Sequence, residues 1–68
     1  MVKLDWVRVE TELAKHAMTK AELASRAGLK VATLEKYLNM GKSSYTAAKD
    51  MAKVLGLGQH DLIIWQKK

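Results

Sequence analysis

The chain has 68 residues, which suffices for one small domain, and it contains no cysteine that could form a disulfide or a thiolate metal site. No apolar run approaches the roughly 18 residues of a transmembrane helix, and the N-terminus lacks the apolar core of a signal peptide. These features argue against disulfide-stabilised, membrane-spanning and secreted proteins. We expect a single cytoplasmic domain over residues 1–68.

Composition and charge favour a helical domain with a polyanionic partner. Apolar residues make up 49% of the chain, Phe and Pro are absent, and Ala, Leu, Lys and Glu are abundant. The formal net charge is +5, and residues 15–53 alone carry a net +5. Residues 1–14 carry −1 and residues 54–68 carry +1, so the excess positive charge lies in the middle of the chain.

The first predicted helix runs from Asp5, a good N-cap residue, to Ala17. Trp6, Val9 and Leu13 fall at i, i+3 and i+7. This spacing is typical of the buried stripe of an amphipathic helix, so we expect all three side chains to face the core. A very short connection leads to the next helix.

The second predicted helix begins at a capping box. Thr19 can accept a hydrogen bond from the backbone N–H three residues later, and the carboxylate of Glu22 can reach back to the cap. Apolar residues then recur at helical spacing: Leu23, Ala24 and Ala27. Gly28 follows, where a left-handed residue ends a helix at low steric cost.

A third helix is predicted from Lys30 or Val31 to Met40, with Leu34 and Leu38 one turn apart on its inward face. Two short helices joined by a tight glycine turn, with a small residue at their contact, cross steeply. This arrangement is the helix-turn-helix unit. The crossing leaves the outer face of the third helix open.

The last third of the chain is predicted to be helical as well. Ser44 or Thr46 can cap a fourth helix that ends near Leu55, and Gly56 interrupts the helical pattern. Residues 59–65 are predicted as a short fifth helix. The expected fold class is therefore all-α, a compact bundle of about five short helices without strands.

Four consecutive large apolar residues lie near the C-terminus: Leu62, Ile63, Ile64 and Trp65. They cannot all face inward from one short helix, so some are expected to pack against the first helix, near Trp6, and some to stay exposed. An exposed apolar patch on a small domain favours a dimer interface formed by these four residues. The alternative is that all four close the core.

Residues 20–39 resemble the helix-turn-helix of the phage-repressor and Cro-like family. That family's 20-position pattern has a small residue at the fifth place, glycine at the ninth, and aliphatic residues at the fourth, tenth, fifteenth and eighteenth. This chain carries at these places, in that order, Ala24, Gly28, Leu23, Leu29, Leu34 and Tyr37, of which only Tyr37 departs from the pattern. The similarity extends over about residues 4–64 and implies a lambda-repressor-like DNA-binding domain.

The resemblance places base-reading positions at the start of the third helix: Val31, Ala32, Thr33 and Lys36. The methyl groups of Ala32 and Thr33 can pack against thymine methyls, and Lys36 can donate to guanine O6 and N7. The helical spacing of Val31 is equally compatible with core burial, and this alternative stays open. We take Glu35 to be solvated or internally paired in preference to a cytosine contact.

Phosphate contacts are expected at both ends of the helix-turn-helix, where they would set register and supply most of the affinity. Thr19 and Lys20 lie at the N-terminus of the second helix, where free N–H groups favour an anion. Lys30 can contribute at the turn. A second group follows the third helix: Asn39, Lys42, Ser43 and Ser44. For Arg26 and Lys53 we favour a solvated surface role.

No other chemistry is indicated by the sequence. His16 and His60 lie far apart without cysteines nearby, so we expect no metal site. No serine lies beside a base, and paired carboxylates at catalytic spacing are missing, so we expect neither enzymatic activity nor a cofactor. His16 is expected to complement the dipole of the first helix.

The resemblance implies a sequence-specific transcriptional regulator of phage or prokaryotic origin, a Cro-like repressor that acts by operator occupancy. Two copies would bind a pseudo-palindromic operator in double-stranded DNA as a homodimer. Antitoxins and excision or copy-control proteins use the same fold, and the residues do not distinguish these roles. A protein-interaction module is the alternative from another class. We expect no membrane partner and no small-molecule substrate.

Overall fold

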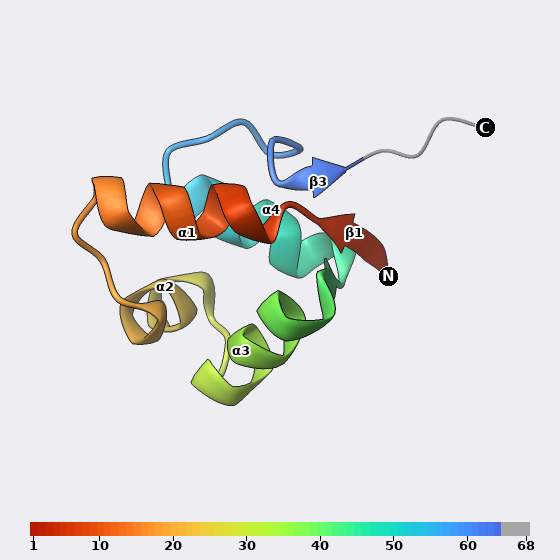
Figure 1. Ribbon diagram of the computed structural model, residues 1–68, viewed down its shortest axis with the longest axis horizontal. Helices are drawn as coiled ribbons and strands as arrows, with labels where there is room; N and C mark the ends of the chain where they lie inside the picture. Colours follow the sequence, from red (N-terminus) through yellow and green to blue (C-terminus); the bar gives the residue numbers. More distant parts are fainter. Residues whose placement is uncertain (65–68) are drawn as a thin grey trace.

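The computed structural model describes residues 1–64, which form four helices and a small three-stranded sheet (Figure 1). The elements in chain order are β1 (Val2–Leu4), α1 (Trp6–Lys15), α2 (Lys20–Ala27), α3 (Val31–Met40), β2 (Lys42–Ser43), α4 (Tyr45–Val54) and β3 (Ile63–Ile64). The mainly helical fold expected from the sequence is confirmed, with four helices in place of about five. None of the helices in this part of the chain is long and apolar enough to cross a membrane.

The predicted N-cap of α1 is correct, because the Asp5 carboxylate accepts the N–H of Arg8 at 3.1 Å. The helix ends at Lys15, two residues before the predicted end, where Ala17 adopts a positive φ of 49°. Val9 and Leu13 are buried as expected, but the expectation of a buried Trp6 is wrong, since it is 46% exposed.

The exposure of Trp6 follows from how β1 closes the core beside it. The residue before α1, Asp5, donates its backbone N–H to the carbonyl of Leu62 at 2.8 Å. Leu4 and Leu62 are both almost completely buried and fill the space under the start of α1. Trp6, the first residue of the helix, is therefore left at the rim and lies over Gly41. A Cβ added to Gly41 would lie 3.6 Å from the indole Cδ1 of Trp6.

The sequence predicts a fold without strands, and this prediction is also wrong. β1 pairs antiparallel with both other strands, in the order β2-β1-β3. Lys3 lies opposite Lys42 in one ladder and opposite Ile64 in the other. Strands of two or three residues are too short for an alternating pattern to be recognised, and their pairing joins segments far apart in the sequence.

The predicted fifth helix over residues 59–65 is wrong within the part that the structure describes. Residues 59–62 form turns, the Asp61 carboxylate accepts the N–H of Gly58 at 2.8 Å, and the chain then enters β3. The β-branched pair Ile63–Ile64 suits extended backbone better than a helix. Trp65 lies outside the described residues.

The core lies between the helices and one face of the sheet. Small residues let α2 and α4 pack closely: Ala24, Ala27, Ala47, Ala48 and Ala52 are all buried. Larger side chains complete the cluster, and the fully buried ones include Leu4, Leu23, Leu34, Met51 and Leu62. This packing holds α2 against α4, so that α3 is presented at the edge of the molecule (Figure 1).

Glu12 is the one buried carboxylate among residues 1–64, and the side chains of Arg8, Lys15 and His16 lie around it. Its Oε2 lies 3.2 Å from Arg8 Nε and 3.5 Å from Lys15 Nζ, and its Oε1 lies 3.5 Å from His16 Nε2. Burial alone would raise the pKa of Glu12, but the Arg8 hydrogen bond and the charges of Lys15 and Arg8 outweigh burial. The pKa of Glu12 is therefore lowered below its ordinary value.

Candidate nucleic-acid interface

The junction between α2 and α3 has the geometry that the sequence predicts. The Thr19 hydroxyl accepts the N–H of Glu22 at 3.1 Å, and the Glu22 carboxylate accepts the Thr19 N–H at 3.5 Å, which completes the capping box. Gly28 ends α2 with a φ of 74°, in the left-handed region. The N–H of Leu29 then donates to the carbonyl of Ala24 at 2.7 Å and closes the turn.

This junction turns one face of α3 inward and the other outward. Leu34 and Leu38 are buried against the core, as predicted. Ala32 and Lys36 are exposed on the opposite face, one helical turn apart. In Figure 1, α3 forms the lower edge of the molecule, and α1 and α4 both lie on its inner side. The outer face of α3 is thus open to a large partner.

The remaining predicted base-reading residues lie beside this outer face. Val31 is 40% exposed, so the alternative of core burial does not apply to it. Thr33 is half-buried. Glu35 is exposed, and among residues 1–64 it takes part in no ion pair.

Two predicted phosphate contacts from different helices are brought together. Lys20 starts α2 and Asn39 lies near the end of α3, and both line one shallow hollow. Trp6, Glu10 and Leu38 complete its wall. The Thr19 hydroxyl is engaged in the capping box, so the start of α2 offers an anion chiefly backbone N–H groups and the Lys20 ammonium.

The segment after α3 contributes less than the sequence predicts. Lys42 is exposed in β2, but Ser43 is completely buried and its hydroxyl donates to the carbonyl of Ser44 at 3.0 Å. Burial removes the Ser43 side chain from the set that could reach phosphate. The hydroxyl of Ser44 caps α4 by accepting the N–H of Ala47 at 3.2 Å, which leaves its own proton available for donation.

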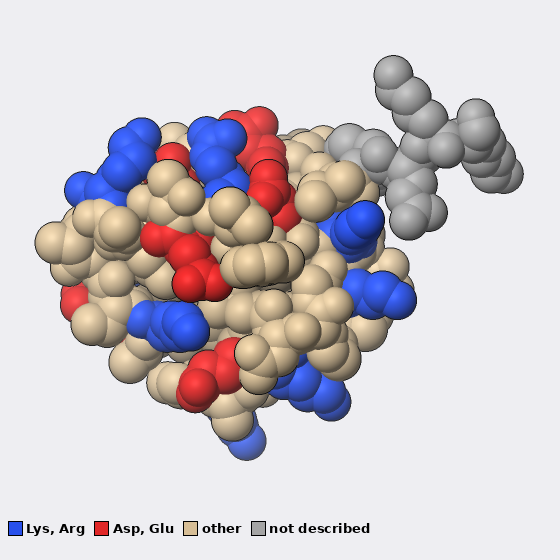
Figure 2. Space-filling model, in the orientation of Figure 1, with Lys and Arg blue, Asp and Glu red and all other residues tan. Residues whose placement is uncertain are grey.

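Arg26 pairs with Glu22 at 3.9 Å, but the lysines of this region have no such partner within residues 1–64. Four lysines around α2 and α3 form no ion pair with any residue of the range 1–64: Lys20, Lys30, Lys36 and Lys42. Figure 2 shows basic side chains along the right and lower edges, over β1 and α3, and others at the upper left, with acidic side chains between these groups and at the top. Unpaired cations on this scale suit a polyanion.

Two residues near this surface were missed from the sequence. The sequence predicts a buried Trp6 and gives no indication of a contact at Lys3. Both line a second hollow beside the end of α3, together with Lys42. A tryptophan at the first position of a helix, directly after the N-cap, is the only signal in the sequence that could have indicated a rim position.

The described residues offer no other obvious chemistry. Residues 1–64 contain no group of three His, Cys, Asp or Glu side chains that could hold a metal ion. His16 lies near Glu12 at the end of α1, and the His60 imidazole lies 2.6 Å from the Tyr45 hydroxyl. These contacts join elements of the fold and do not face α3.

Comparison with known proteins agrees with this geometry. The family model for the Cro/C1-type helix-turn-helix DNA-binding domain matches residues 8–68. Neither a comparison with curated proteins nor one with solved structures gave a match. The family match spans α1 to the C-terminus and includes both helices of the motif, so this chain belongs to the Cro/C1-type helix-turn-helix DNA-binding domains.

Proposed function

We propose that this protein is a sequence-specific regulator of transcription that reads double-stranded DNA with the outer face of α3. The observation that carries the proposal is the exposed pair Ala32 and Lys36 on a helix flanked by unpaired lysines at both ends. An α-helix fits the major groove, and cations on either side of it would meet the two phosphate backbones.

The side chains of α3 fit a defined pattern of base contacts. The Lys36 ammonium would donate to guanine O6 and N7, and the methyl groups of Val31, Ala32 and Thr33 would pack against thymine methyls. The apolar start of α3 therefore favours an A·T-rich stretch beside a G·C pair in each half-site.

The phosphate contacts would come from both ends of the motif. Lys20 and the N–H groups at the start of α2 would hold one strand, and Asn39 and Lys42 the other, with Thr19, Lys30 and Ser44 beside them. Each neutralised phosphate contributes about −0.9 to the slope of log K against log salt concentration. Binding should therefore weaken steeply as salt is added.

The proposed mode of action is occupancy by a homodimer. Two copies would place their α3 helices in half-sites about 34 Å apart on a pseudo-palindromic operator, and binding over a promoter would exclude polymerase. Ile64 is 40% exposed, whereas Leu62 and Ile63 are buried, so Ile64 and Trp65 remain the proposed contacts of the tail. A Cro-like repressor in a phage or prokaryotic cytoplasm fits this mode of action.

Selection from a pool of randomised duplexes tests the proposal. At about 50 mM salt the protein should enrich one two-fold-symmetric sequence over plain competitor DNA, and raising the salt to about 200 mM should lower its affinity by orders of magnitude. Failure to enrich any sequence, with only weak and uniform DNA binding, would rule out sequence-specific regulation.

A further inference from the structure

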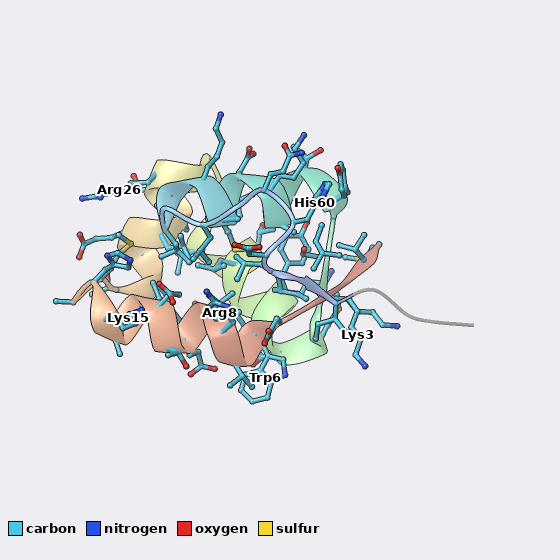
Figure 3. The ribbon with its side chains drawn as sticks, turned by 90° about the horizontal axis from the view of Figure 1, so that it is seen from above. Lys3, Trp6, Arg8, Lys15, Arg26 and His60 are labelled. Atoms are coloured by element: carbon cyan, nitrogen blue, oxygen red, sulfur yellow. The ribbon has the colours of Figure 1, made fainter. Side chains whose placement is uncertain are left out.

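Trp6 holds an exposed indole ring at the junction between α1 and the end of α3. The ring points outward from α1 on the side away from Arg8 (Figure 3). The ring packs over Gly41, and a Cβ added to Gly41 would lie 4.0 Å from the indole Nε1. In the part of the chain that the structure describes, no hydrogen bond involves this indole N–H, although a tryptophan N–H is a good donor.

Next to this ring, two lysines face each other across the sheet. Lys3 in β1 and Lys42 in β2 are direct cross-strand partners. Like charges at such positions repel and destabilise the pair. No carboxylate among residues 1–64 forms an ion pair with either ammonium. An external anion would relieve this repulsion.

The indole links this lysine pair to the contacts proposed above. Trp6 lines the hollow that contains Lys3 and Lys42, and it also lines the hollow that contains Lys20 and Asn39. Each hollow has one acidic residue in its wall, Asp5 and Glu10 respectively, and Asp5 already accepts a backbone N–H as the cap of α1. Positive charge exceeds negative charge around the ring.

We infer that Trp6 and Lys3 form a further contact with the DNA sugar–phosphate backbone, beyond the helix-turn-helix. This inference rests on the proposed function. The indole N–H donates to a phosphate oxygen, and the Lys3 and Lys42 ammonium groups neutralise the phosphates on either side of it. Val7, Met40 and Ile64 give the same hollow apolar walls, and Ile64 is also a proposed dimer contact. At Lys3 and Lys42 the opposed charges favour a polyanion over an apolar protein surface.

The test uses the full chain and the duplex enriched in the selection above. Trp6→Phe keeps an aromatic ring over Gly41 but removes the N–H donor. It should weaken binding about tenfold on the enriched duplex and on unrelated DNA alike, as loss of a hydrogen bond to a charged group does.

Charge removal provides an independent readout. Lys3→Gln should reduce the salt slope by about 0.9, whereas Lys53→Gln, which removes the same charge from the exposed end of α4, should leave the slope unchanged. Thermal melting of each variant checks that the domain still folds.

The outcomes separate this inference from the proposed function. If the wild type enriches no sequence, the proposed function fails. If the wild type binds DNA while Trp6→Phe and Lys3→Gln bind with its affinity and salt slope, the inference about Trp6 and Lys3 is overturned and the function stands. If Trp6→Phe alters dimerisation in sedimentation without changing the affinity for a single half-site, the surface contacts protein and the inference is likewise overturned.

Discussion

At the scale of single residues, Glu12 shows how a buried charge is retained in a small core. Its carboxylate is almost completely buried, yet Arg8, Lys15 and His16 all lie within ion-pair distance of it. Arg8 and Lys15 belong to the same helix as the carboxylate and His16 directly follows it, at spacings of three or four residues, so folding of α1 brings all three side chains to Glu12.

The lowered pKa of Glu12 makes a pH-dependent prediction. A carboxyl group whose pKa is lower in the folded than in the unfolded state stabilises the fold above its ordinary value of 4.5. That stabilisation is lost as the pH falls through the folded-state pKa. Glu12→Gln should therefore lower the melting temperature at pH 7, and the difference from wild type should shrink as the pH falls below about 4.5.

Thermal melting of both proteins between about pH 3 and pH 7 measures this difference. Glu10→Gln is the matched control, since Glu10 is an exposed residue of the same helix and forms no ion pair within residues 1–64. A gap between Glu12→Gln and wild type that stays constant with pH would show that the ionised carboxylate does not contribute.

At the scale of elements, the structure shows which of two candidate residues caps α4. Ser44 and Thr46 both suit an N-cap, and the structure uses Ser44, whose hydroxyl accepts the Ala47 N–H. Ser44→Ala should cost about 1 kcal/mol of unfolding free energy. Thr46→Ala, at an exposed position without this bond, should stay within about 0.5 kcal/mol of wild type in denaturant unfolding. Equal losses in the two variants would contradict the cap assignment.

The helices could be predicted from the sequence because their signals are local. The capping box at Thr19 and the left-handed Gly28 give both ends of α2, and the pair Leu34 and Leu38 gives the inward face of α3. The outward position of Lys36 follows from the same periodicity, so the predicted base-reading face could be placed without the structure.

The sheet could not be predicted, because its signals are not local. β2 and β3 have two residues each, and their partner β1 lies about 40 and 60 residues earlier in the sequence. The exposure of Trp6 and the burial of Ser43 both depend on this sheet, as does the pairing of Lys3 with Lys42. The sequence therefore predicted the motif well and its surroundings poorly.

At the scale of the whole molecule, the core lies on the inner side of α3 and the outer face of α3 stays exposed. The core takes side chains from all four helices, including Leu34 and Leu38 of α3, and leaves the outer face of α3 uncovered (Figure 1). Lysines that form no ion pair within residues 1–64 lie at both ends of α3, and the buried carboxylate lies on α1. This arrangement leaves an exposed helix with lysines at both ends, which suits our proposal that α3 reads a groove between two phosphate backbones.

The central claim is that the outer face of α3 reads bases, and one comparison tests it most directly. Wild type, Lys36→Ala and Lys20→Ala are each selected against the same randomised duplex pool. Lys36→Ala should lose the preference at one base pair per half-site, worth about 1–3 kcal/mol, while Lys20→Ala should weaken all sequences alike and keep every preference. If Lys36→Ala kept the full wild-type preference at every position, α3 would not be the element that reads the sequence.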